Sequence, residues 1–197
     1  AKSVTIKGIQ RGLIFNFEVT QTFVHYESDA QEINYIFPND LKICIYDTTF
    51  IVGKEIIKPK LKAKKEAYEI YKEAVSAGRT AIYGSNIGNG LTQFKLGNVM
   101  PKIECKVILQ ISFIAQQTNE KTFYIKFPID VYTPNGSRGC LDLFFSNFLF
   151  EIQCDSEKVK NVKSNVKNGQ FDNNSKLFTI AQTIDNDDNQ KSIIVTF

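Results

Sequence analysis

The feature that most constrains this chain is a strict alternation of apolar and polar side chains near its start. In GLIFNFEVTQTFVHY, residues 12–26, apolar side chains occupy the odd positions Leu13, Phe15, Phe17, Val19 and Phe23. Polar side chains occupy the even positions Asn16, Glu18, Thr20 and Thr22. A period of two places each set on its own face of a strand. The segment is therefore predicted to be a strand with one buried face.

Further segments with strand character follow at short intervals. QEINYIFP ends at Pro38, and LKICIYDTTFIVG ends at Gly53. The other candidates are LTQFKLGNVMP, ECKVILQISFIA, KTFYIKFPI, LDLFFSNFLFEIQC, KVKNVKSN, SKLFTIAQT and KSIIVTF. Short strands separated by turn residues are typical of an antiparallel β-sandwich. We predict a mostly β fold and one domain over residues 1–197, completed by the strands of 141–197.

One segment, KAKKEAYEIYKEAVSAG, departs from this pattern. Its apolar side chains recur at helical spacing, at Ala63, Ala67, Ile70, Tyr71 and Ala74. The pairs Lys62–Glu66 and Lys65–Glu69 suit the wet face of a helix. Gly78 can adopt the positive φ that often follows a helix. These features predict a helix over about residues 62–77.

The next segment, AIYGSNIGNG, is predicted to be a mobile loop because it is dense in Gly and Asn. A phosphate-binding loop would need a Lys and a Ser or Thr directly after its last Gly. Leu91 and Thr92 follow Gly90 instead. We therefore expect no nucleotide site here.

The residue inventory argues against catalysis. His25 is the only histidine, which excludes most Ser–His and Cys–His schemes. The carboxylates are scattered, and the acidic turn at Asp185, Asp187 and Asp188 is interpreted as a solubilising turn in preference to a weak Ca²⁺ site. We expect no enzymatic activity, no metal and no cofactor.

The four cysteines lack the close ligand pairs of a zinc site. They are Cys44, Cys105, Cys140 and Cys154. Buried free thiols are the favoured interpretation. Two disulfides are the alternative if the parent protein is secreted. The N-x-S/T sequons at Asn135 and Asn173 would be glycosylation sites only in that case. We favour the cytoplasm over secretion.

Charge and hydropathy limit the partners. The formal net charge is +3, too mild and too dispersed for a nucleic-acid binder. No apolar run is long enough to cross a bilayer. The strongest local feature is a basic run made of Lys54, Lys58, Lys60, Lys62, Lys64 and Lys65. It could bind an acidic partner, or it could simply be a solvated edge strand on which lysines discourage edge pairing.

The order of these motifs resembles the VIT domain, the vault protein and inter-α-trypsin inhibitor heavy-chain domain. The family's strand pair ends in a Phe-Pro or Leu-Pro step, here Phe37 and Pro38. The helix carries an A-x-x-x-Y-x-x-A signature and ends in Gly, here Ala67, Tyr71, Ala74 and Gly78. A G-N-I/V-x-P turn follows, here Gly97, Asn98, Val99 and Pro101. Recognisable motifs cover roughly residues 4–132.

The resemblance implies a β-sandwich with one packed helix. It also implies a non-catalytic interaction or scaffolding module, with protein partners that include an adjacent von Willebrand factor type A domain. The D-x-S-x-S metal loop of that neighbour does not occur in this chain, so no metal site is carried over. Two alternatives remain open: an extracellular adhesion or carbohydrate-binding sandwich, and an accessory domain of a vault-type ADP-ribosyltransferase.

Overall fold

The computed structural model describes residues 2–38, 43–119, 121–128, 147–155, 158–181 and 192–197. These residues form fifteen strands and one helix, which confirms the mostly β prediction. The largest sheet contains β1 (Ser3–Arg11), β2 (Ile14–Val24), β4 (Ile43–Val52), β5 (Glu55–Ile57), β8 (Glu104–Ile114), β11 (Asn147–Cys154), β13 (Gln170–Asp172) and β14 (Leu177–Ala181). A second sheet contains β9 (Gln116–Asn119), β10 (Thr122–Pro128), β12 (Lys163–Ser164) and β15 (Ser192–Thr196). A third contains β3 (Gln31–Pro38), β6 (Ala81–Gly88) and β7 (Leu91–Val99), and the helix is α1 (Lys64–Ser76).

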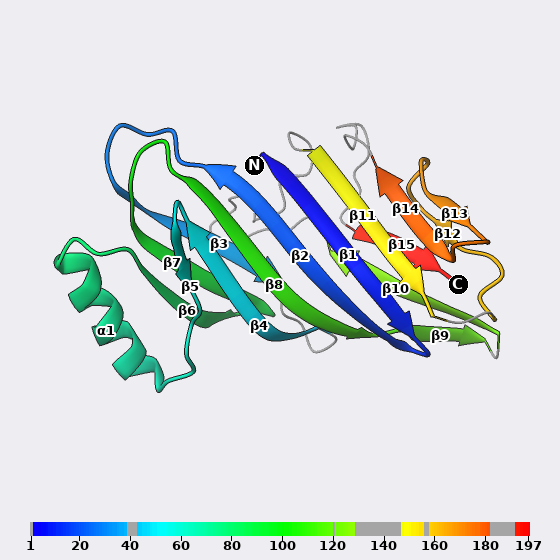
Figure 1. Ribbon diagram of the computed structural model, residues 1–197. Coiled ribbons are helices and arrows are strands. Elements are labelled where there is room, and N and C mark those ends of the chain that lie inside the picture. The colour runs from blue at the N-terminus through cyan, green and yellow to red at the C-terminus, as the bar shows by residue number, and fades with distance from the viewer. Residues whose placement is uncertain (1, 39–42, 120, 129–146, 156–157, 182–191) are drawn as a thin grey trace.

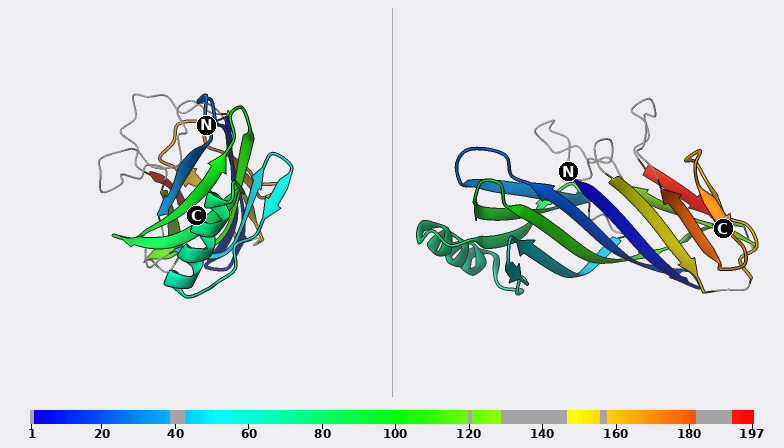
Figure 2. Two further views of the ribbon diagram at one scale, coloured as in Figure 1. Left: turned by 90° about the vertical axis from the view of Figure 1, so that its left-hand side faces the viewer. Right: turned by 45° about the horizontal axis from the view of Figure 1, so that its top comes forward.

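The three sheets form two layers. The eight-stranded sheet has the order β13-β14-β11-β1-β2-β8-β4-β5, and both smaller sheets lie against one of its faces (Figure 1). The three-stranded sheet lies toward the β4 side, and the four-stranded sheet lies toward the β11 side. Helix α1 extends beyond the three-stranded sheet at one end of an elongated molecule, while the C-terminal strand lies at the other end (Figure 2).

The alternation in β2 builds the core between these layers. Phe15, Phe17 and Val19 are almost fully buried, as the period of two predicts. The Phe17 ring meets the Phe127 ring of the four-stranded sheet edge-on, at 5.4 Å between centroids. At the other end, the Phe50 ring lies 5.2 Å from that of Phe94 in the three-stranded sheet. Because burying one such side chain contributes about 1.5–3 kcal/mol, these aromatic contacts bind both small sheets to the large one.

The opposite face of the large sheet carries a row of polar side chains. Lys7 forms an ion pair of 3.3 Å with Glu151 across β1 and β11. The Gln110 amide donates a hydrogen bond of 2.7 Å to Glu18, and the Tyr46 hydroxyl donates one of 3.4 Å to Gln110. Each exposed pair contributes little stability. The row explains why the even positions of β2 are polar.

The sheet is not wholly antiparallel, which corrects the prediction in one detail. β1 runs parallel to β11, with Val4 opposite Phe148 and Gly8 opposite Ile152. Parallel neighbours cannot be joined by a tight turn, and these two strands lie far apart in the sequence. The alternation within each strand could not reveal this pairing, because it fixes faces and not neighbours.

The prediction that AIYGSNIGNG forms a loop was wrong, because most of this segment forms strand β6. Position 84 of this strand needs a glycine, because a Cβ there would come 2.9 Å from the Phe94 ring. Gly88 pairs with Leu91, and the two residues between them, Asn89 and Gly90, have φ values of 52° and 68°. Two successive positive φ angles are typical of the tight turns that suit a β-hairpin. The Gly and Asn residues therefore serve a strand–turn–strand unit.

Two smaller expectations also need correction. Ile70, assigned to the apolar stripe of the helix, is 46% exposed, and the half-buried Val75 faces the sheet instead. Cys44 is exposed, whereas Cys105 and Cys154 are buried free thiols as expected. Cys140 lies outside the described residues.

The bulge in β4 at Tyr46 shifts the register against β8, which interrupts the simple alternation of this strand.

Candidate functional site

Helix α1 rests on the three-stranded sheet through a cluster of three tyrosine rings. Tyr71 is the one residue of α1 that is buried. Its ring lies 5.9 Å from that of Tyr83 in β6, and the Tyr68 ring meets Tyr83 edge-on at 5.3 Å. Ala67 and Ala74 are half-buried on either side. Their small side chains let the helix approach the sheet around the tyrosine.

A polar contact fixes the tip of this tyrosine. The Tyr71 hydroxyl donates a hydrogen bond of 2.5 Å to Glu32 Oε2, and Lys95 Nζ lies 2.8 Å from Glu32 Oε1. Burial alone would raise the pKa of Glu32, but the hydrogen bonds from Lys95 and Tyr71 hold that pKa below its usual value. Burial, together with the neighbouring Glu32 carboxylate, raises the pKa of Tyr71 well above its usual range. Both groups therefore keep their usual neutral-pH forms, a carboxylate and a phenol.

Gly97 and Asn98 of β7 contact the C-terminal half of the helix. A Cβ at Gly97 would lie 2.4 Å from Val75 Cγ2 and 2.8 Å from the Tyr71 hydroxyl, so the helix needs a glycine here. Asn98 has a φ of 54°, and its side-chain amide donates hydrogen bonds to the carbonyl oxygens of Val75 at 2.7 Å and Arg79 at 3.3 Å. The last carbonyls of a helix lack intrahelical partners. Asn98 therefore acts as a cap supplied by the sheet.

Gly78 ends the helix as the sequence predicted. Its φ is 72°, and its N–H donates to the Val75 carbonyl at 3.0 Å. The N–H of Arg79 donates to the carbonyl of Ala74 at 2.9 Å. A residue with positive φ directly after the helix is the usual way to turn the chain back toward the last carbonyls.

The predicted motif residues thus divide into two groups. The structure brings together around α1 those of the helix signature and the following turn: Ala67, Tyr71, Ala74, Gly78, Gly97 and Asn98. Phe37 lies in the core and Pro38 ends β3, while Pro101 lies in the turn between β7 and β8. Sequence reasoning missed Glu32, Lys95 and Tyr83, because no local spacing linked them to the helix.

The predicted lysines lie in one stretch, residues 54–65, which we call the lysine strap. It runs from the turn after β4, through edge strand β5 and an extended segment, into the first turn of α1. All six lysines are exposed. Lys58 pairs with Asp47 at 3.8 Å, and Lys62 pairs with Glu66. Of the others, Lys54, Lys60, Lys64 and Lys65 form no ion pair with any residue that the structure describes.

A shallow groove of about 620 Å³ lies beneath the lysine strap. The strap contributes Lys60, Lys62 and Lys64 to it, and β6 and β7 contribute Ile82 and Phe94. Large apolar side chains stand exposed around the same end of the molecule, namely Ile56 at 69%, Leu61 at 104%, Tyr68 at 41% and Ile70 at 46%. This end therefore combines free positive charge with exposed apolar surface.

Catalytic features are not assembled within the described part of the chain. No group of three or more His, Cys, Asp or Glu side chains there could hold a metal ion. His25 is buried, and its Nε2 lies 2.8 Å from the Asp29 carbonyl oxygen, as in a structural histidine. Asn173 lies exposed between β13 and β14, and Asn135 and the acidic turn at 185–188 fall outside the described residues. Helix α1 is too short and too polar to cross a bilayer.

Together, the fold and this site define a two-layer β module whose single described helix is locked to a small sheet by a Tyr–Glu contact and a Gly–Asn cap. Residues 1–113 match the family described as the vault protein inter-alpha-trypsin domain, or VIT. The match covers more than half of the chain, so the chain belongs to the VIT family.

Two curated relatives are mammalian enzymes. The chain is 32% identical to the protein mono-ADP-ribosyltransferase PARP4 of Mus musculus over 127 residues, and 33% identical to that of Homo sapiens over 117 residues. These matches cover 64% and 58% of this chain but only 6% and 7% of the relatives. They fall in the VIT region, so they show no catalytic activity for this chain.

The fold has been seen at low sequence identity. A solved structure of a candidate nutrient-binding protein from Legionella pneumophila superposes with a TM-score of 0.59 at 10% identity, covering 98% of this chain and 65% of that one. An M1 zinc metallopeptidase from Deinococcus radiodurans gives a TM-score of 0.46 over 41% of its length. At this identity, the first likeness concerns the fold alone.

Proposed function

We propose that residues 1–197 act as one non-catalytic module that mediates protein contacts within a larger protein. Its contact surface is the lysine strap together with the outer face of α1. The observation that carries this proposal is the coincidence of unpaired lysines and exposed apolar side chains at one end of the molecule. Exposed apolar surface ringed by polar groups is characteristic of interaction sites.

The mode of attachment of α1 supports this role. The helix buries Tyr71 against the sheet and leaves Tyr68 and Ile70 partly exposed. A helix whose outer face is not needed for folding can contact a partner without disturbing the core. Gly97 and Asn98 then serve the function indirectly, because they hold that face in a fixed orientation.

The charge of the lysine strap indicates what kind of partner fits. Lys60, Lys64 and Lys65 present positive charge beside apolar groups, which favours an acidic protein surface with apolar patches. In the VIT family, a von Willebrand factor type A domain is the expected neighbour. We propose that such a domain, or another acidic protein surface, docks here.

Crosslinking mass spectrometry of the parent protein in native extract tests this proposal. A lysine-reactive crosslinker should join the strap lysines to a partner protein or to another domain of the parent. Lys102, Lys126 and Lys167 are exposed at other places and serve as internal controls. Partner crosslinks that are spread evenly over strap and control lysines, or that are confined to the control lysines, would contradict the proposal.

A second candidate role is that of an accessory domain in a vault-type ADP-ribosyltransferase. The matches to the two PARP4 proteins favour this candidate. In it, the transferase activity belongs to another part of the parent chain, and this module positions that part within its assembly. The full parent transcript decides the matter: a transferase domain downstream supports this role, and a parent without one removes it.

A further inference from the structure

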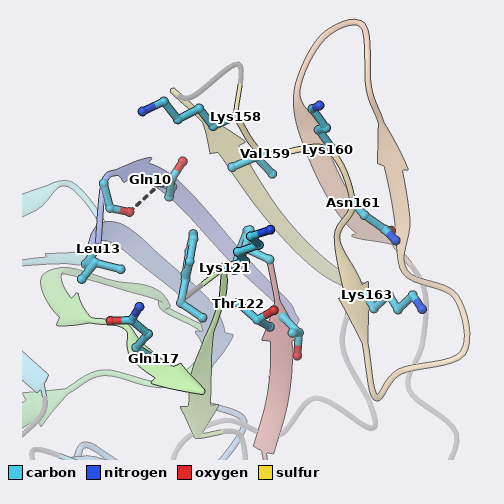
Figure 3. Close-up of a pocket in the computed structure, with 14 residues that line it drawn as sticks. Gln10, Leu13, Gln117, Lys121, Thr122, Lys158, Val159, Lys160, Asn161 and Lys163 are labelled. Carbon is cyan, nitrogen blue, oxygen red and sulfur yellow. Dashed lines mark hydrogen bonds between the residues drawn. The ribbon is translucent and has the colours of Figure 1, made fainter. Parts of the chain in front are cut away.

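A separate pocket, which we call the distal pocket, is shown in Figure 3. The β9–β10 hairpin and the end of β15 contribute to it, and they lie at the end of the molecule opposite α1 (Figure 1). The volume of the pocket is about 830 Å³, within the range of about 300–1,000 Å³ that is typical of small-molecule sites. The β1–β2 turn, the β9–β10 hairpin, the segment 158–163 and the end of β15 surround it. None of its lining residues belongs to the lysine strap or to the motifs around α1.

The apolar part of the lining, which we call the floor, contains Phe123, Phe197, Leu13 and Val159 and packs against the core. Phe123 and Phe197 stack nearly parallel, with ring centroids 5.2 Å apart and 8° between the planes. Phe15 of the core lies 5.0 Å from Phe197, which ties this pair to the main hydrophobic cluster. Leu13 and Val159 complete the apolar lining. An apolar group that entered the pocket would meet aromatic and aliphatic side chains already held in place by the core.

The rim of the distal pocket is basic. Lys121, Lys158, Lys160 and Lys163 line it, and none of the lining residues that the structure describes carries a carboxylate. Lys158 and Lys160 lie at the top of the view in Figure 3, Lys163 at its right and Lys121 near its centre. The nearby carboxylate of Asp155 lies 3.8 Å from Arg11. Long lysine stems can bring their ammonium groups over the opening, so the rim favours a negative charge.

Hydrogen bonds hold the walls between floor and rim. Gln10 is only 1% exposed, its Nε2 donates to the Gly12 carbonyl at 2.6 Å, and its Oε1 accepts from the Asp155 N–H at 3.3 Å. On the other side, Lys176 Nζ donates to the Val159 carbonyl at 3.1 Å. These bonds fix the β1–β2 turn and the segment after β11 relative to each other. The pocket is therefore a formed feature of the fold.

We propose that the distal pocket binds a small amphipathic anion, a carboxylate on an aliphatic body such as a medium-chain fatty acid. The aliphatic body lies on Phe123, Phe197, Val159 and Leu13, and the carboxylate lies among the rim lysines. A purely polar anion would leave the apolar floor in contact with water, and a neutral or cationic amphiphile would gain nothing from the rim. A bilayer surface fits less well, because the apolar surface lies inside a concavity.

Titration calorimetry with decanoate, decyltrimethylammonium and acetate tests this proposal. We expect saturable binding of one decanoate per chain, weakened by added salt, and no measurable heat from the other two probes. Methyl NMR signals of Leu13 and Val159 should shift on addition of decanoate. Equal binding of the decyl cation, or shifts confined to residues outside the pocket, would overturn the proposal.

Variants locate the site and separate it from the lysine strap. Lys160→Glu/Lys163→Glu should weaken decanoate binding by about tenfold or more, since it replaces two ammonium groups of the rim by carboxylates that repel the anion. Leu13→Glu, at a side chain that is 44% exposed, should weaken binding without unfolding the chain. The charge-matched control Lys60→Glu/Lys64→Glu should bind decanoate normally. Unchanged binding in both pocket variants, or binding only to phosphatidylserine vesicles and not to monomeric decanoate, would contradict the assignment.

Discussion

The side-chain amide of Asn98 in β7 donates a hydrogen bond of 2.7 Å to the main-chain carbonyl of Val75 in the last turn of α1. This contact joins a strand to a helix end 23 residues earlier in the chain. It gives the Gly-Asn turn of the family motif a physical role: Gly97 makes room for the helix, and Asn98 caps it. The orientation of α1, and of the lysine strap before it, depends on this pair.

Replacing Asn98 should destabilise the chain through two separable effects. Asn98→Gly keeps the positive φ but loses the cap, so we expect a loss of about 1 kcal/mol in the free energy of unfolding. Asn98→Ala also forces a Cβ into the left-handed region, so we expect a loss of about 2 kcal/mol. Urea unfolding of both variants measures the difference. Equal stability of Asn98→Ala and the wild type would refute the capping role.

Gly97→Ala should loosen α1 without disrupting the main core. The new methyl group would overlap Val75 Cγ2, and overpacking of this kind costs about 1–3 kcal/mol. Hydrogen exchange should show faster exchange for amides of 64–76 and unchanged exchange in β2 and β8. The double variant Gly97→Ala/Val75→Ala removes the closest overlap and should restore part of the protection. If it restores none, the overlap with Val75 is not the cause.

Acid should weaken the contact between Glu32 and Tyr71. The folded pKa of Glu32 lies below its unfolded value of about 4.5, so its stabilising contribution is complete above that value. The contribution is lost as the pH falls through the lower folded pKa. Glu32→Gln should therefore lose stability relative to the wild type at pH 7, and the gap should shrink at pH 3. Thermal unfolding at both pH values checks this, and a gap that widens in acid would reverse the sign.

The three described cysteines should differ sharply in reactivity. Burial raises the pKa of Cys105 and of Cys154 to about 11, while Cys44 is exposed. The thiolate is the reactive form, so a maleimide should modify Cys44 in the folded chain and reach Cys105 and Cys154 only after denaturation. Peptide mass spectrometry measures each site. Rapid native labelling of Cys105 would mean that β8 is not buried as described.

Local patterns in the sequence predicted the elements but not all of their relations. The two-residue period placed Phe15 and Phe17 inside, and the helical period together with Gly78 placed α1. The parallel pairing of β1 with β11 was not predictable, because it joins distant segments that share no turn. β6 was missed because its Gly84 serves a contact with an aromatic ring that only the folded sheet creates.

The candidate site was predictable to a similar degree. The basic run identified the lysine strap, because clustered charge is visible in the sequence. The ion pair of Lys58 with Asp47 was not visible, and neither was the contact of Tyr71 with Glu32, since both partners come from other strands. The distal pocket was missed for the same reason: the β1–β2 turn, the β9–β10 hairpin and the segment 158–163 that line it meet only in the fold.

The most direct test of the central claim compares two charge reversals in the full parent protein. Lys60→Glu/Lys64→Glu changes the lysine strap, and Lys126→Glu/Lys167→Glu makes the same change of charge at other exposed positions. Sedimentation of native extracts measures the fraction of parent protein in its assembled form. We predict that the strap variant loses most of that fraction while the control keeps it. Equal assembly of both variants would contradict the assignment of the lysine strap as the contact surface.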